Sequence, residues 1–376
     1  MRLTTAGSAA LALTLAVMFV GGVGLQQSAS AVEAAAAVDP RAIAERIAVL
    51  LQTEYMDAET GKAYAARLRE QAAHGAYDGL VGAALAERLT LDLLAVKDDR
   101  HLRVRLGAPM MHRMSGPAPT GGPRQPPGDA APPTIETAGW ITPAIAFIRF
   151  NEFPRDPAGI EAVRAFLREH AAATTLIFDL RTNHGGGPDL LDALFPILFP
   201  KPMRLASAEA RRGMESVALT GPNLRAVEGA PSNVKEYWVT PEAAGPLQRV
   251  KVLVLTSPAT ASAAEVFSAA MKWSGRGTLI GGQTAGANHF GTLEMLDGGL
   301  TLFLPVGRMF NPADGKDWEG VGIAPDIAVA PEQALTVALV RAGVPEAEAA
   351  RLSNQYRPTL PMTRRAAPGT TGSASP

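Results

Sequence analysis

A serine stands where the sequence predicts that a buried strand turns into a helix. Residues 250–271 read VKVLVLTSPATASAAEVFSAAM, an apolar run followed by small residues that include Ser262. A helix start offers unpaired backbone N–H groups and a partial positive charge, so a serine there is placed to attack a carbonyl and to have the resulting oxyanion stabilised. Ser262 is therefore a candidate nucleophile.

The same letters also fit a purely structural interpretation. Glu265 follows Ser262 by three residues, which is the spacing of a capping box that closes the start of an ordinary helix. These letters alone leave both interpretations open.

Three consecutive glycines follow a second predicted strand. Residues 179–187 read DLRTNHGGG. Glycines allow backbone N–H groups to approach a ligand closely, as an oxyanion hole requires, so Gly185 and Gly186 are candidates for that role. The N–H of Ala263, directly after the serine, is a candidate for a further donor. An ordinary glycine turn is the alternative.

A sheet is needed to bring these segments together. Between residues 137 and 345 short apolar strands alternate with helical segments, which indicates an α/β core with a mainly parallel sheet. In residues 39–106 apolar residues recur at helical spacing and then alternate with polar ones. This pattern predicts a small N-terminal helical subdomain that ends in a strand.

The remaining segments are interpreted from their composition. Residues 107–136 are dense in proline and glycine, which indicates a linker or mobile loop, and residues 357–376 are predicted to form a disordered tail. Residues 1–31 combine Arg2, an apolar run and small residues suited to cleavage, which predicts a signal peptide. We therefore expect an exported protein, periplasmic or extracellular, with no stable membrane span after signal removal. An uncleaved membrane anchor is the alternative.

Composition and charge exclude several classes of function. The formal net charge is −1 with both signs spread along the chain, so we expect no nucleic-acid partner. The chain has no cysteine, which excludes thiol catalysis, so a nucleophile here is a hydroxyl. The 6 histidines are scattered, with none paired at helical metal-ligand spacing. We therefore expect no metal and no cofactor, and the sequence indicates no particular oligomeric state.

Three motifs in this order resemble those of the C-terminal processing (tail-specific) serine peptidases. The family signature D-x-R-x-N-x-G-G is matched by DLRTNHGGG, its nucleophile segment by TSPATASAAE at residues 256–265, and its closing G-I-x-P-D motif by WEGVGIAPD at residues 318–326. The resemblance covers residues 39–330. It implies a ClpP/crotonase-like α/β fold, Ser262 as the nucleophile, and peptides or unfolded proteins as substrates.

The matching segments point to one branch of this family. Bacterial processing proteases pair their serine with a lysine in T-F-G-K-G, whereas the matching TAGANH has Ala287 at the lysine position. The stretch DRHLRV at residues 99–104 instead resembles the branch of tricorn and interphotoreceptor retinoid-binding protein. That resemblance implies His101 as the general base, with an unperturbed pKa of about 6.5, and Glu319 as the carboxylate of the relay.

Other residues near these motifs are alternative catalytic groups or are expected to support the site. Glu265 is a rival acid, and His184 and His289 are rival bases beside glycine-rich loops, although His289 also suits the lining of a substrate cleft. Asp179 and Arg181 are expected to support the glycine loop through a salt bridge or backbone contacts.

The leading hypothesis is an exported serine peptidase that hydrolyses peptide bonds through an acyl-enzyme on Ser262. A binder of apolar ligands without catalysis, resembling the retinoid-binding protein, is the alternative, because one fold can host unrelated functions.

Overall fold

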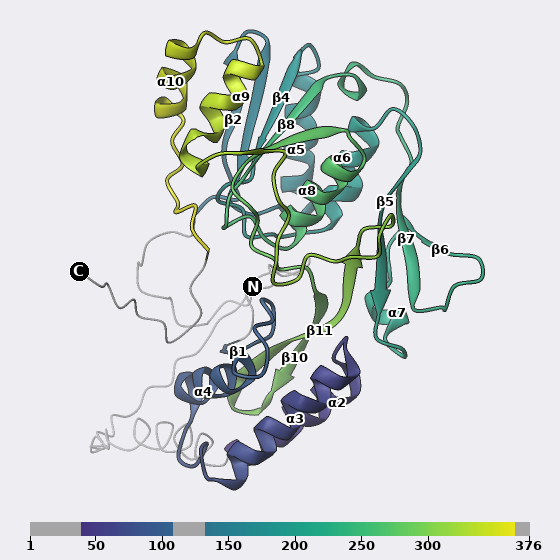
Figure 1. The fold of residues 1–376 in the computed structure, drawn as a ribbon, viewed down its shortest axis with the longest axis vertical. Helices are drawn as coiled ribbons and strands as arrows, with labels where there is room; N and C mark the ends of the chain where they lie inside the picture. Colours follow the sequence, from purple (N-terminus) through teal and green to yellow (C-terminus); the bar gives the residue numbers. More distant parts are fainter. Residues whose placement is uncertain (1–38, 108–131, 365–376) are drawn as a thin grey trace, which may run out of the picture. The chain divides into compact units, whose positions relative to one another are not determined.

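The computed structural model describes residues 39–107 and 132–364 (Figure 1). The predicted signal peptide, residues 1–31, lies outside the described residues, as do residues 108–131 of the predicted linker and residues 365–376 of the predicted tail. The elements given below belong to one unit, Pro40–Pro376. In the part of the chain that is described, no helix is long and apolar enough to cross a membrane.

A six-stranded sheet forms the centre of the fold. Its strand order is β12-β9-β8-β4-β3-β2, and every neighbouring pair is parallel except β2 and β3. The strands are β2 (Ile135–Thr142), β3 (Ile145–Phe150), β4 (Thr175–Asp179), β8 (Lys251–Thr256), β9 (Gly277–Gly281) and β12 (Ile327–Ala328). The predicted α/β core with a mainly parallel sheet is thus confirmed, and β2 begins within the range predicted as linker.

Helices cover both faces of this sheet. The helices are α5 (Pro157–Glu169), α6 (Asp189–Leu198), α8 (Ala263–Trp273), α9 (Ala334–Arg341) and α10 (Glu346–Gln355). Because side chains along a strand alternate between faces, Ile148 and Phe178 pack in the core that contains α5, α6 and α8, whereas Phe147 and Ile177 pack under α9 and α10. Figure 1 shows these two helix groups on opposite sides of the strands.

A second sheet is antiparallel throughout. Its order is β1-β11-β5-β7-β6, and β10 also pairs with β11. The strands are β1 (Arg103–Leu106), β5 (Met203–Ala210), β6 (Leu224–Ala226), β7 (Val234–Val239), β10 (Phe290–Leu296) and β11 (Leu300–Phe310). The short helical segments are α7 (Glu215–Ala218), η1 (Pro246–Gln248), η2 (Asp297–Gly299) and η3 (Pro331–Gln333).

In the described part of the chain, three helices precede β1, as the spacing of apolar residues predicts. They are α2 (Pro40–Glu54), α3 (Ala58–Ala73) and α4 (Gly82–Leu94). This segment is tied to the second sheet, because β1 pairs with β11 and the Met56 N–H donates to Pro305 O at 3.0 Å. The pairing of β1 holds the residues directly before it, including His101, beside the C-terminal half of the chain.

The chain after α10 follows the surface of the core. The Arg149 guanidinium donates to Tyr356 O, and the Thr359 N–H donates to Glu136 Oε1 at 3.0 Å. Residues 357–364, although part of the predicted disordered tail, therefore have described partners in the core. They carry the chain to Arg364, whose guanidinium donates to Ala285 O.

Candidate active site

Three loops meet at one edge of the parallel sheet. Residues 180–187, 257–262 and 282–289 follow β4, β8 and β9, which are adjacent and parallel, so their carboxyl ends lie together. Hydrogen bonds join the loops directly: Thr260 Oγ1 to Leu180 O at 2.8 Å, Ala261 N to Asn183 O at 3.0 Å, and Ala285 N to Thr260 O at 2.8 Å. The loops thus form one connected platform.

Ser262 occupies a strained position on this platform. It lies directly before α8 with φ 55° and ψ −124°, and no other non-glycine residue in the described ranges has a positive φ. Backbone conformations of this kind cost about 1–3 kcal/mol and persist only where the surroundings enforce them, commonly at functional sites. The predicted turn from a buried strand to a helix start is therefore present at Ser262. Its positive φ is not a feature that an ordinary helix cap requires.

Gly185 brings the glycine loop against this serine. It has φ +110°, and a Cβ atom built on it would lie 2.7 Å from Ser262 Cβ. Its own N–H donates to Asn183 Oδ1 at 2.8 Å. By contrast, the N–H groups of Gly186 and Ala263 have no acceptor within the described residues. Of the three predicted oxyanion-hole residues, Gly186 and Ala263 therefore offer donors, and Gly185 provides the close approach.

Glu265 ties the serine turn to the loop after β9. Its buried carboxylate accepts four hydrogen bonds, from Ser262 N at 3.1 Å, Thr284 Oγ1 at 2.6 Å, Gly286 N at 2.8 Å and Ala287 N at 2.7 Å. Burial raises the pKa of Glu265 to about 7, against the opposing effect of these hydrogen bonds. Glu265 thus supports the turn, as the capping interpretation predicts, and Ala287 at the lysine position contributes a backbone donor.

His101 and Ser262 line the same pocket, which has a volume of about 270 Å³. The His101 ring lies 5.2 Å from the Phe303 ring, measured between centroids, and its buried Nδ1 has no hydrogen-bond partner in the described structure. Burial lowers the pKa of His101 to about 4. The imidazole is therefore neutral at pH 7, which is the form that accepts a proton from a serine hydroxyl. His184 also lines this pocket.

His289 is paired with a buried carboxylate outside that pocket lining. Its Nδ1 lies 2.7 Å from Asp99 Oδ2, and Asp99 also accepts from Tyr55 OH at 2.8 Å and His101 N at 2.8 Å. Burial lowers the pKa of His289, but the hydrogen bond and charge of Asp99 outweigh it and the net pKa is raised. Burial raises the pKa of Asp99, yet His289 holds it below its ordinary range. The pKa of His289 is thus raised whereas that of His101 is lowered, so the neutral form that accepts a proton persists to lower pH in His101.

The Glu319 carboxylate contacts this part of the site through backbone N–H groups. Its carboxylate accepts from Arg100 N at 3.1 Å, Asn288 N at 2.6 Å and His289 N at 3.1 Å, and burial raises its pKa. The predicted contact between Glu319 and the His101 ring is not formed among the described residues, since His101 Nδ1 has no partner there. Glu319 instead joins the residue before His101 to the loop after β9.

Asp99, His289 and Glu319 are residue types that can bind a metal ion, and they lie close together. One donor atom from each lies within 4.8 Å of the others. Each carboxylate already accepts at least three N–H or O–H donors from the protein. These contacts connect the residues around His101 with the loop after β9.

Asp179 and Arg181 lie beneath the glycine loop as an ion pair. Arg181 Nε and Nη2 each lie 2.8 Å from an oxygen of Asp179, and Arg149 Nε donates to the same carboxylate at 2.8 Å. Burial raises the pKa of Asp179, but the two guanidinium groups outweigh it and lower the pKa to about 2. Neither Asp179 nor Arg181 lines the pocket, and the ion pair between them is the contact that the sequence predicts beside the glycine loop.

Sequence reasoning missed several residues of the site. Asp99 lies within the quoted DRHLRV stretch, so its charge beside His101 was a usable signal, whereas Tyr55 follows α2 without any local signal. Arg364 enters the pocket from the predicted tail, and three more arginines line it. Their convergence depends on tertiary structure.

Comparisons with known proteins agree with this architecture. Residues 144–329 match the sequence model of Peptidase family S41. The chain is 31% identical over 157 residues to the chloroplastic C-terminal processing peptidase of Tetradesmus obliquus, covering 42% of this chain and 29% of that protein. The chain thus spans about a third of the length of the curated relatives it matches.

The fold is also similar to that of solved structures, including the following two. The photosystem II D1 C-terminal processing protease superposes with a TM-score of 0.50 at 17% identity, covering 78% of this chain and 94% of that one. A lipoprotein from Streptococcus agalactiae superposes with a TM-score of 0.54 at 14% identity, covering 81% and 96%. At these identities the likeness concerns the fold alone.

Proposed function

The chain belongs to peptidase family S41, and we propose that it hydrolyses peptide bonds through an acyl-enzyme on Ser262. The observation that carries this proposal is that Ser262, in a strained turn at a helix start, shares a pocket of about 270 Å³ with His101. Peptides or unfolded proteins are the proposed substrates, because the reaction needs an accessible backbone carbonyl.

In the proposed mechanism His101 acts first as base and then as acid. The neutral imidazole takes the proton of Ser262 Oγ as the oxygen attacks the scissile carbonyl, and the oxyanion accepts hydrogen bonds from the N–H groups of Gly186 and Ala263. His101 then gives the proton to the leaving amine. A water molecule hydrolyses the ester by the same steps in reverse.

Glu319 is the proposed carboxylate of the relay. It now accepts a hydrogen bond from the backbone of Arg100, directly before His101. Catalytic hydrogen bonds are often long or incomplete without substrate and tighten when substrate binds. We place the completion of the contact between Glu319 and the His101 ring at that step.

The alternative function, a binder of apolar ligands without catalysis, has less support. The pocket beside Ser262 is lined by four arginines, which do not suit a ligand without charge or hydrogen-bonding groups.

We also propose that the protein is exported, periplasmic or extracellular, on the basis of the predicted signal peptide at residues 1–31. Sequencing the N-terminus of protein recovered from cell fractions tests this part.

Covalent labelling tests the proposed nucleophile. A fluorophosphonate probe should label the wild-type protein, and Ser262→Ala should abolish the labelling. Ser274→Ala is the matched control, because Ser274 lies at the opposite end of α8 and should leave labelling intact. Folded wild-type protein that takes no label, or a label that persists in Ser262→Ala, would contradict the proposal.

A further inference from the structure

We propose that an arginine cluster beside Ser262 binds a carboxylate of the substrate close to the scissile bond. The arginine cluster consists of Arg100, Arg103, Arg105 and Arg364, and it lines the same pocket as Ser262 and His101. Among the described residues that line this pocket, none is an aspartate or a glutamate. The inference rests on the proposed peptidase function and narrows its class of substrate.

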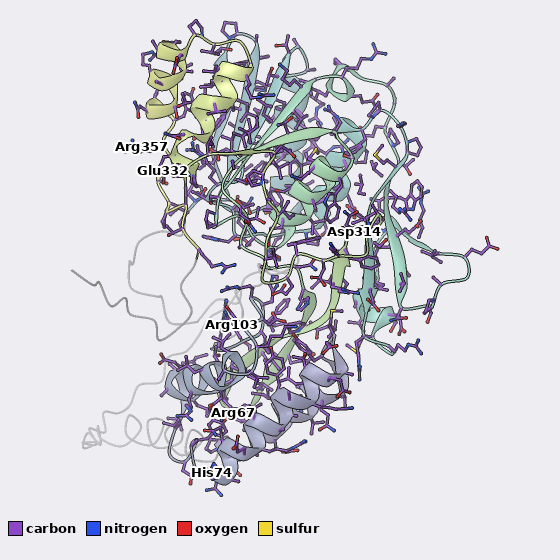
Figure 2. The ribbon with its side chains drawn as sticks, viewed as in Figure 1. Arg67, His74, Arg103, Asp314, Glu332 and Arg357 are labelled. Carbon is purple, nitrogen blue, oxygen red and sulfur yellow. The ribbon has the colours of Figure 1, made fainter. Side chains whose placement is uncertain are left out.

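Two segments far apart in the sequence build the cluster. Arg103 and Arg105 share one face of β1 because side chains alternate along a strand, and Figure 2 shows Arg103 where β1 begins. Arg364 arrives from the C-terminal segment, and its guanidinium donates to Ala285 O in the loop after β9. A fold that brings these guanidinium groups together beside a nucleophile concentrates positive charge where the substrate must bind.

Asp98 and Asp99 offset part of the positive charge of Arg100 and Arg103. Asp98 pairs with Arg100 at 2.8 Å and reaches Arg103 at 3.8 Å, and its side chain is 49% exposed. The remaining described hydrogen bonds of Arg103 go to backbone carbonyls, those of Asp99 and Leu102. One half-exposed carboxylate therefore forms ion pairs with two guanidinium groups. The Asp99 carboxylate is hydrogen-bonded to His289, although its charge also favours the charged form of Arg103.

Mutual repulsion within the cluster supports the inference. Burial lowers the pKa of Arg103. The charges of Asp98 and Asp99 oppose this shift, and the charges of Arg100 and Arg105 add to it. Burial likewise lowers the pKa of Arg364, and the charge of Arg100 adds to the effect, against the opposing charges of three nearby carboxylates, Asp98, Glu265 and Glu319. A bound anion would relieve this repulsion, and a planar guanidinium can hold a carboxylate through two parallel hydrogen bonds.

The chemistry of the site selects the kind of anion. A substrate of Ser262 presents a peptide carbonyl in this pocket, and the anionic groups that a peptide carries are carboxylates. The carboxylate comes either from an aspartate or glutamate side chain or from the C-terminus of the substrate. Both sources offer the same chemistry to the arginine cluster, so the test must separate them.

Four quenched fluorescent peptides of one sequence provide that test. They carry either glutamate or glutamine beside the scissile bond, and either a free or an amidated C-terminus. We expect the wild-type kcat/KM to be at least about tenfold higher for a peptide with the matching carboxylate, a difference of about 1.4 kcal/mol. A higher kcat/KM for glutamate than for glutamine identifies a side-chain carboxylate as the source, and a higher kcat/KM for the free than for the amidated peptide identifies the C-terminus.

Variants connect the preference to the arginine cluster. Arg105→Gln and Arg364→Gln should each reduce the ratio of kcat/KM for carboxylate and neutral peptides toward one, with less change for the neutral amidated peptide. Both residues are exposed, so the variants should fold. Arg364→Lys should restore part of the ratio, because it keeps the charge but loses the bidentate geometry. Arg351→Gln, at an exposed ion pair on α10, is the control and should leave the ratio unchanged.

A binding measurement separates failure of this inference from failure of the proposed function. Fluorescence anisotropy with Ser262→Ala should show tighter binding of the carboxylate peptide and weaker binding at high salt. Equal hydrolysis and equal binding of all four peptides would overturn the inference while leaving the peptidase intact. If no peptide is hydrolysed and no probe labels Ser262, the proposed function fails, and the anisotropy of the same peptides still decides whether the arginine cluster binds carboxylates.

Discussion

Gly185 lies directly against Ser262: a Cβ atom on the glycine would lie 2.7 Å from Ser262 Cβ and 3.2 Å from Ser262 Oγ. The two residues belong to loops that follow the neighbouring strands β4 and β8. Two reasons require a glycine at position 185. Its φ of +110° suits glycine, and the space that a side chain would occupy is already filled by the nucleophile.

We predict that Gly185→Ala strongly reduces peptidase activity. The added methyl group must displace Ser262 or the glycine loop, so kcat/KM should fall by at least about 10²-fold because the attacking oxygen is misplaced. Gly213→Ala is the matched control, since Gly213 also has a positive φ, +92°, but no atom within 4 Å of the added Cβ. It should share the backbone cost, measured by urea unfolding, without the loss of activity. Equal activity in the two variants would contradict the close contact.

We predict that Ser262→Gly is more stable than Ser262→Ala. Alanine keeps the strained φ of 55°, whereas glycine adopts positive φ without steric cost. Relief of the strain should make the free energy of unfolding about 1 kcal/mol higher for the glycine variant than for the alanine variant. Both variants should be inactive, and urea denaturation measures the difference. An alanine variant at least as stable as the glycine variant would show that the turn is not strained.

The sequence predicts the parts of the molecule that depend on local patterns. The largely apolar sequences of β3, β4 and β8 indicate strands buried on both faces, and the structure confirms a mainly parallel sheet. Because parallel neighbours end at one edge, the motifs that follow β4 and β8 had to meet. The family resemblance implies that His101 acts on Ser262, whereas the pairing of β1 with β11 beside their shared pocket has no signature in the local pattern.

The parts that could not be predicted depend on contacts between distant segments. Tyr55 and His289 meet at the carboxylate of Asp99 although they lie far apart in the chain. Arg364 comes from a stretch whose proline-rich composition indicates disorder, yet it lines the pocket. The partners of Glu319 are backbone N–H groups, which have no signature in the sequence.

We predict that Asp179→Asn destabilises the fold. The change leaves the guanidinium groups of Arg149 and Arg181 buried beside a neutral amide, which costs about 3–5 kcal/mol for a broken buried pair. Urea unfolding at pH 7 measures the loss. Glu161→Gln is the control, because Glu161 pairs with Arg168 on the surface and such pairs contribute at most about 1 kcal/mol.

The effect of Asp179 should also depend on pH. Its pKa is about 2 in the folded protein and 3.8 in the reference state, so its stabilisation is present above pH 3.8 and is lost as the pH falls through about 2. The difference in unfolding free energy between wild type and Asp179→Asn should therefore shrink across this window. A difference that stays constant down to pH 2 would show that the pKa of Asp179 is not lowered.

We predict that the pH dependence of kcat/KM identifies the general base. Catalysis needs the neutral form, and burial lowers the pKa of His101 to about 4, so a limb due to His101 lies near pH 4, with activity falling as the pH decreases through it. His289 would instead give a limb above pH 6.5, because its pKa is raised. Rates between pH 3.5 and 8 with a neutral peptide distinguish the two.

Variants complete this assignment. His101→Ala should lower kcat/KM by about 10²–10⁴-fold, the usual contribution of a general base, whereas His74→Ala, at the exposed end of α3, should leave it unchanged. A limb near pH 7 that disappears in Glu265→Gln would trace to Glu265, whose pKa is about 7, and would not bear on the base. A limb above pH 6.5 that persists in Glu265→Gln and disappears in His289→Gln would transfer the role of base from His101 to His289.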